Sequence, residues 1–131
     1  MYSNFWESLI HNVHKGKYGH YNIGALLMNS SQFLYLTTIG WKSRKKHKIE
    51  IWFVEHKERY YIMSELQKKT HWVQNIIHNP RVSFTINDTI FTGTARIVEQ
   101  DKEPELTAEV SKLMSTKYGW KGGLIVELRY D

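Results

Sequence analysis

Short segments rich in β-branched and aromatic residues recur along this chain, and most of them are joined by turns rather than by helical crossovers. The segments are 32–39, 49–54, 59–64, 81–86, 90–98 and 123–129. Strands that are joined by turns pair antiparallel, whereas parallel strands need a crossover of about a dozen residues or more. The pattern predicts a mainly β protein of about six strands. A small antiparallel barrel is the economical arrangement, because closure removes exposed sheet edges.

Two interior helices are predicted at the periphery of this barrel. Residues 71–78 have one apolar face, with Thr70 as a candidate N-cap and Asn79-Pro80 as the stop. A second helix begins at Asp101 or Pro104 and ends near Tyr118-Gly119, where the glycine suits a C-cap.

A third helix is predicted near the N-terminus. Residues 4–14 carry apolar side chains at helical spacing, namely Phe5, Leu9, Ile10 and Val13. The pattern favours a helix that covers the end of the sheet. Shielding of a cofactor and contact with a membrane surface are its alternative roles.

The length and composition indicate one globular domain. The chain has 131 residues and no cysteine, which excludes disulfides, thiolate metal sites and a cysteine nucleophile. No apolar run approaches the roughly 18 residues of a membrane span, and no secretory signal is evident. A cytoplasmic location is the expectation.

The net charge of +5 is concentrated in one short segment. Residues 42–48 read Lys-Ser-Arg-Lys-Lys-His-Lys and hold five of the 18 Lys and Arg but no acid, so the remainder of the chain balances 13 bases against 13 acids. A cluster this dense repels itself unless it is fully solvated or binds an anion. Both readings are open on charge alone.

Catalytic motifs that depend on the protein's own side chains are missing. The seven histidines lack zinc-ligand spacing, and no Gly-x-Ser-x-Gly, Gly-x-Gly-x-x-Gly or phosphate-loop motif occurs. We predict neither a metal site nor a catalytic side chain, with haem ligation by one histidine as an alternative. A redox cofactor carries its own reactive atom, and needs from the protein an anion clamp and an apolar wall. The basic segment and the aromatic residues supply both.

Two stretches carry a family resemblance. Leu36–Val54 (LTTIGWKSRKKHKIEIWFV) resembles the deazaflavin-dependent nitroreductase and quinone reductase family, whose usual pattern is Thr-Thr-x-Gly-Arg-Lys-Ser/Thr-Gly-x-x-Arg before an apolar strand. His71–Val82 (HWVQNIIHNPRV) is similar to the family's Trp-x-x-Asn-Leu-x-x-Asn-Pro-x-Val. The similarity extends through Arg59–Ser64, Thr94–Arg96 and Leu124–Glu127, and so over most of the chain.

The resemblance implies a fold and a site. The fold is an antiparallel split β-barrel of the FMN-binding, pyridoxamine-phosphate-oxidase type, here one domain over residues 1–131. Such barrels are usually homodimers with the cofactor in a groove beside the barrel. By resemblance, Lys42 and Ser43 belong to the phosphate-binding hairpin, Ser64 lies near the deazaflavin ring, and Trp72 lies close to the cofactor.

In and beside the basic segment, the chain departs from the family pattern. Trp41 and His47 stand where the family usually has arginine, and Arg44 stands where it has glycine. A histidine lacks the bidentate fork of arginine, and a position with positive φ favours glycine. We therefore expect the phosphate contacts to be shared among several residues: Arg44, Lys45, Lys46, His47 and Lys48.

The function implied is that of a flavin- or deazaflavin-dependent oxidoreductase acting on a small quinone-like or nitro acceptor. FMN ends in one phosphate, whereas F-420 continues from its phosphodiester into a glutamate tail, and five cations suit the longer anion better. Coenzyme F-420 is therefore favoured over FMN. The alternatives are a non-enzymatic flavin or haem binding module and a nucleic-acid binder. One basic loop on an otherwise neutral chain makes nucleic acid the weakest of these, and we do not expect it as a partner.

Overall fold

The computed structural model describes residues 33–120 and 122–131. The helix predicted over residues 4–14 lies outside the described residues. None of the helices in the described part is long and apolar enough to cross a membrane.

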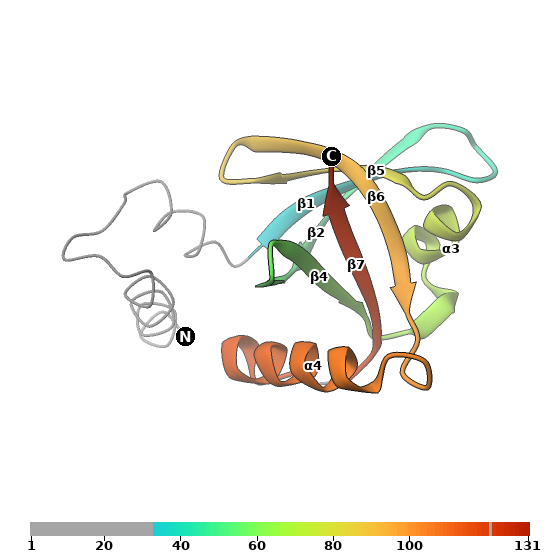
Figure 1. Ribbon diagram of the computed structural model, residues 1–131. Helices are drawn as coiled ribbons and strands as arrows, with labels where there is room; N and C mark the ends of the chain where they lie inside the picture. Colours follow the sequence, from blue (N-terminus) through green and yellow to red (C-terminus); the bar gives the residue numbers. More distant parts are fainter. Residues whose placement is uncertain (1–32, 121) are drawn as a thin grey trace.

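Seven strands form one sheet in the order β2-β1-β5-β6-β7-β4-β3, and every pairing is antiparallel. The strands are β1 (Phe33–Ile39), β2 (Lys46–Trp52), β3 (Val54–His56), β4 (Arg59–Ser64), β5 (Arg81–Ile86), β6 (Thr89–Val98) and β7 (Leu124–Tyr130). The sheet curls into a half-barrel (Figure 1). The predicted antiparallel split barrel is confirmed.

Alternation of side chains along the strands builds the barrel interior. In β5, Val82, Phe84 and Ile86 are buried while the residues between them are not, as the period of two predicts. The interior is apolar, and its fully buried members include Leu34, Leu36, Ile62, Phe84, Val126 and Leu128.

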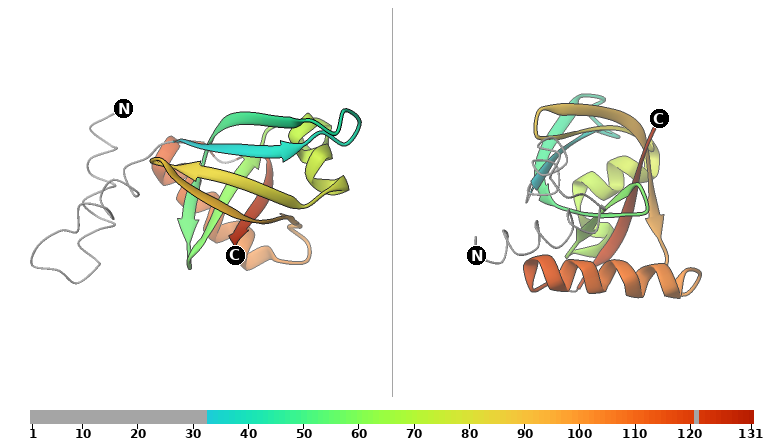
Figure 2. Two further views of the ribbon diagram at one scale, coloured as in Figure 1. Left: turned by 90° about the horizontal axis from the view of Figure 1, so that it is seen from above. Right: turned by 60° about the vertical axis from the view of Figure 1, so that its left-hand side comes forward.

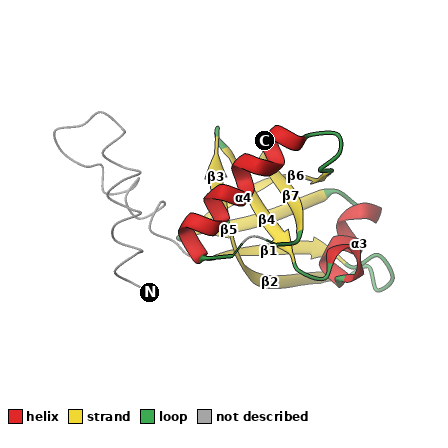
Figure 3. Cartoon of the chain, turned by 90° about the horizontal axis from the view of Figure 1, so that it is seen from below, coloured by secondary structure: helices red, strands yellow, loops and turns green. Residues whose placement is uncertain are grey.

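In the described part of the chain, two α-helices pack against the sheet. Helix α3 (His71–His78) buries Trp72, Val73 and Ile76, and Figure 2 shows it beside the loop of the β1–β2 hairpin. Helix α4 (Pro104–Tyr118) lies across β4 and β7 (Figure 3). Its two buried side chains, Val110 and Met114, complete a second apolar cluster. As predicted, the helix ends at Gly119, whose φ of 71° is left-handed.

The strand predicted over residues 49–54 is wrong at both of its ends. The β1–β2 register pairs Ile39 with Lys46, so β2 begins three residues earlier than expected and only residues 40–45 form the turn. The chain then leaves the strand at Phe53, and Val54 opens β3. Instead of a strand neighbour, the Phe53 backbone bonds α4: its N–H donates to the Tyr118 hydroxyl (3.1 Å), and its carbonyl accepts from the same hydroxyl (2.7 Å). This break yields seven strands where about six were expected.

Gly93 of β6 marks a close approach of backbones rather than a bulge. It pairs in register with Val82 of β5 and with Tyr130 of β7. A Cβ at this position would collide with the Arg129 carbonyl group, so the pairing of β6 with β7 requires glycine here.

Candidate functional site

A groove of about 1240 Å³ opens between two walls of the molecule. One wall is the β1–β2 hairpin and the other is the β4–α3 connection together with α3. Its lining residues are Gly40–Ser43, His47–Ile49, Leu66, Lys68–Trp72, Gln74 and Asn75.

The groove has a strongly one-sided charge. Both walls contribute lysines, Lys42 and Lys48 from the hairpin and Lys68 and Lys69 from the short helix η1 (Gln67–Lys69), whereas no carboxylate is among its described lining residues. His47 and His71 add two imidazoles. Cations that face each other without acids between them create a field that attracts an anion.

A tight turn shapes the hairpin wall. Gly40 N–H donates to the Lys45 carbonyl (2.7 Å), and Arg44 N–H donates to the Gly40 carbonyl (2.8 Å). The Ser43 hydroxyl lies 3.0 Å from His47 Nε2 and accepts from Lys45 N–H (3.2 Å). The turn is therefore fixed by its own hydrogen bonds before any ligand arrives.

Arg44 has the left-handed backbone that the family's glycine at this position suggests. Its φ is 62°, and a side chain in this region costs on the order of 1 kcal/mol. We expect Arg44→Gly to raise the free energy of unfolding by about 0.5–1 kcal/mol. Arg44→Ala is the matched control: it removes the same charge, keeps the strained backbone, and should bring no gain in chemical denaturation. Equal stability of the two variants would contradict this account.

One buried amide connects the two walls. Asn75 of α3 is 5% exposed; its Oδ1 accepts from Trp41 N–H (3.2 Å), and its Nδ2 donates to the Thr38 hydroxyl (3.0 Å). Beside it the Trp41 indole stacks on the imidazole of His78, with centroids 4.2 Å apart and planes 12° apart. The end of β1 and the start of the turn are thus held against α3.

The second wall is stabilised by hydroxyl groups. Ser64 is buried, donates to the Gln67 carbonyl (2.8 Å) and hydrogen-bonds the Thr70 hydroxyl. Thr70 occupies the predicted N-cap position of α3, but its side chain caps no backbone N–H because it is turned to Ser64. The N-terminus of α3 therefore presents N–H groups without a side-chain cap at the groove, where a helix attracts anions.

The structure brings together some of the residues predicted for the site. Those that line the groove are Lys42, Ser43, His47, Lys48 and Trp72. Those that do not are Arg44, Lys45 and Lys46, which are exposed, and the buried Ser64. Trp72 is only 8% exposed and packs mostly in the core. Four lining residues were not predicted from the sequence: Lys68, Lys69, His71 and Asn75.

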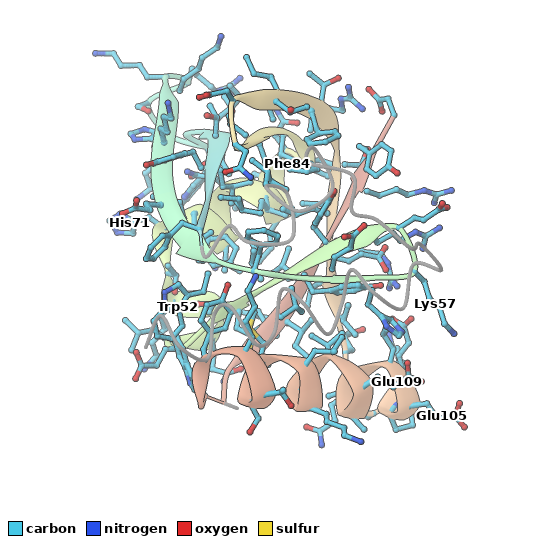
Figure 4. All side chains as sticks on the ribbon, turned by 90° about the vertical axis from the view of Figure 1, so that its left-hand side faces the viewer. Trp52, Lys57, His71, Phe84, Glu105 and Glu109 are labelled. Atoms are coloured by element: carbon cyan, nitrogen blue, oxygen red, sulfur yellow. The ribbon has the colours of Figure 1, made fainter. Side chains whose placement is uncertain are left out.

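A second, smaller pocket of about 250 Å³ lies farther along β2. Its lining is aromatic and sulfur-rich apart from one acid: Phe33, Glu50, Ile51, Trp52, Met63, Met114 and Trp120. Trp52 stacks on Tyr118 with centroids 4.5 Å apart and meets Trp120 edge-on (Figure 4 shows Trp52 above α4). Ile49 lines the groove and Ile51 lines this pocket, so strand β2 contributes residues to both cavities. Among residues 33–120 and 122–131, no three metal-ligating side chains gather.

Comparison with known proteins bears on this site. The sequence model of a family described as F420H(2)-dependent quinone reductase matches residues 9–122. A comparison with curated proteins found no match.

Solved structures share the fold at low sequence identity. The heme storage protein HutZ from Vibrio cholerae is 19% identical with a TM-score of 0.62, over 76% of this chain and 82% of that one. A putative pyridoxamine 5'-phosphate oxidase from Listeria innocua is 14% identical with a TM-score of 0.61, over 80% and 88%. An F420-H2 dependent reductase, FDR-A, is 23% identical with a TM-score of 0.52, over 75% and 94%.

Proposed function

Because the chain belongs to the F420H(2)-dependent quinone reductase family, we propose that it is an oxidoreductase that passes a hydride from reduced coenzyme F-420 to a small quinone-like or nitro acceptor. The observation that carries the proposal is the groove, with lysines on both walls and no carboxylate among its described lining residues. When bound, the reduced deazaflavin ring supplies the hydride.

The donor set of the groove suits an anionic cofactor tail. Lys42 and Lys48 would hold it from the hairpin, and Lys68 and Lys69 from the opposite wall. The Ser43 hydroxyl and the N-terminus of α3 add neutral hydrogen-bond donors, which phosphate accepts readily. Arg44, Lys45 and Lys46 lie outside the groove and would act on the tail only through their longer-range field.

The spread of the cations supports F-420 over FMN. A single phosphate can be neutralised by one wall, whereas a phosphodiester followed by glutamates extends negative charge over a longer path. Lysines on both walls match the longer anion. We therefore propose F-420 as the cofactor, with FMN as the alternative that the titration below distinguishes.

The aromatic pocket is the proposed location of the planar acceptor. Trp52 and Trp120 line it with flat apolar rings, and Met63 and Met114 add adaptable thioethers. Such a lining excludes water from a reacting ring and takes quinone-like or nitroaromatic compounds without a dedicated polar contact.

Anaerobic titration of the purified chain with F-420 and with FMN tests the proposal. We expect F-420 to bind more tightly than FMN, and a soluble quinone to oxidise the reduced cofactor only when the protein is present. The double variant Lys68→Gln/Lys69→Gln should weaken F-420 binding about tenfold, because it removes two cations from one wall.

A matched double variant separates the groove from the general charge of the protein. Lys57→Gln/Lys112→Gln removes two exposed lysines that do not line the groove and should leave the affinity unchanged. Binding of neither cofactor would overturn the proposal. Tight binding without turnover across acceptors would instead make the chain a non-enzymatic carrier.

Three predictions about partners and cofactors stay open beside this proposal. The homodimer that the resemblance implies, the absence of a nucleic-acid partner, and the alternative haem ligand each stay a prediction. Sedimentation, DNA titration and haem titration of the same preparation address them.

A further inference from the structure

Two segments of the sequence, which lie at one end of the described structure, account for the whole charge excess. We call residues 41–48 and 65–78 the basic end: they hold seven of the 18 Lys and Arg and one of the 13 acids, which leaves eleven bases against twelve acids elsewhere. The fold places the two segments as the two walls of the groove, and Figure 2 shows the hairpin loop beside α3 at this end. The described part of the chain is thus strongly polarised, with the groove in its positive end.

The positive charge exceeds what the groove uses. Arg44, Lys45 and Lys46 are exposed at the hairpin turn and do not line the groove. No carboxylate within residues 33–120 and 122–131 forms a salt bridge with any of the three. Within the described part of the chain, these three adjacent cations therefore have no acidic partner and are available to an external anion.

Exposed apolar side chains accompany these cations on both rims of the groove. Leu66, beside Lys68 and Lys69, is 64% exposed, and Trp41, at the base of the basic turn, is 39% exposed. Large apolar groups next to lysines on adjacent loops are the arrangement with which proteins enter the interfacial layer of a bilayer, since the apolar groups insert while the cations stay at the headgroups.

We propose that the basic end docks on an anionic membrane surface. In this arrangement Lys45 and Lys46 contact the lipid headgroups, and the Leu66 side chain inserts between the headgroups. A nucleic acid is the competing polyanion, but single strands need open aromatic faces for stacking. The Trp41 ring is already stacked on His78 and has the Lys42 ammonium 4.8 Å from its centroid. The exposed Leu66 side chain also finds no apolar contact on a phosphate backbone.

Docking holds the protein at the membrane surface. A quinone with a long apolar tail is dissolved in the membrane, so docking would bring such an acceptor close to the protein. This consequence rests on the proposed function, whereas the docking itself depends only on the basic end.

Vesicle flotation with the full chain tests the proposal. We expect binding to vesicles that contain phosphatidylglycerol, little binding to phosphatidylcholine alone, and release at high salt. Lys45→Gln/Lys46→Gln should weaken partitioning about 30-fold, because each lysine near an anionic surface contributes about fivefold to the partition coefficient. The single variant Leu66→Ser should also weaken partitioning, although it leaves the charge of the protein unchanged.

Matched variants lie on other parts of the surface. Lys57→Gln/Lys112→Gln removes the same charge elsewhere, with Lys57 on the opposite side from His71 in Figure 4, and Ile90→Ser removes another exposed apolar residue. Vesicle binding that the Lys45/Lys46 variant leaves unchanged would overturn the proposal, as would binding to DNA but not to vesicles. An F-420 titration of the wild-type chain without vesicles tests the proposed function separately, so loss of docking and failure of the proposed function give different results.

Discussion

Replacement of Glu127 by alanine is expected to lower the free energy of unfolding by about 3–5 kcal/mol, a large part of the stability of a domain of this size. Glu127 lies on β7 and is 2% exposed. Its carboxylate accepts from the Tyr61 hydroxyl (2.8 Å) and from Arg96 Nε (2.9 Å), with Arg59 Nη1 at 3.5 Å. Its removal leaves the buried Tyr61 hydroxyl without its partner and takes from Arg96 one of its two carboxylates, the other being Glu103.

The same carboxyl group makes stability depend on pH. Burial alone raises the pKa of Glu127, but the hydrogen bonds from Arg96 and Tyr61 and the nearby guanidinium charges outweigh it, so the pKa lies below its ordinary value. A depressed pKa in the folded state contributes stability above the unfolded value of about 4.3, and this is lost as the pH falls through the folded value. Glu127→Gln should therefore lose less stability than the wild type on acidification through this window.

An exposed pair provides the control. Arg81 and Asp131 form a bidentate pair at 3.0 and 2.9 Å, but both side chains are more than half exposed. Asp131→Ala should cost far less than Glu127→Ala in urea denaturation at neutral pH, because water replaces the lost contact. Equal losses in the two variants would show that burial does not set the strength of the Glu127 network.

Periodicity predicted most of the sheet because it reports burial directly. Val82, Phe84 and Ile86 alternate in the sequence and all three face the interior. The break at Phe53 had no such signal: residues 49–54 form a continuous run of β-formers, and the residue that binds the Phe53 backbone, Tyr118, is 65 residues away. A strand boundary that a distant hydroxyl determines cannot be read from local pattern.

The site was predictable only where charge was dense. The run 42–48 was conspicuous, and it does supply Lys42, Ser43, His47 and Lys48 to the groove. The sequence alone could not show which residues of this run face the groove, because the hydrogen bonds of the turn determine the direction of each side chain. Lys68 and Lys69 resemble any surface pair of lysines until the fold sets them opposite the hairpin.

Asn75 did leave a signal in the sequence. It lies between Trp72 and Ile76 on the apolar side of the helix 71–78, and a buried amide there requires hydrogen-bond partners. The sequence gives no indication of which partners these are. The structure identifies them as Thr38 and the backbone of Trp41, both on the opposite wall of the groove.

Asn75→Ala is expected to reduce F-420 affinity on the order of 100-fold, because small misplacements of a binding wall have effects of this size. The amide is the hydrogen-bonded connection between α3 and the start of the basic turn, so its loss lets the two sets of lysines separate. Stability should also fall, by about 2–4 kcal/mol, since the buried Thr38 hydroxyl and the part-buried Trp41 N–H lose their partner. Titration and chemical denaturation measure the two effects separately.

Thr38→Val distinguishes positioning from general destabilisation. Thr38 is 1% exposed and does not line the groove, so its hydroxyl can influence the ligand only through Asn75. Thr107→Val is the matched control, because it removes a threonine hydroxyl that donates to the Glu103 carbonyl (2.8 Å) on α4, away from the groove. Both variants should lose about 1 kcal/mol of stability, but only Thr38→Val should weaken F-420 binding. Equal affinities in the two variants would mean that Asn75 supports the fold without positioning the groove.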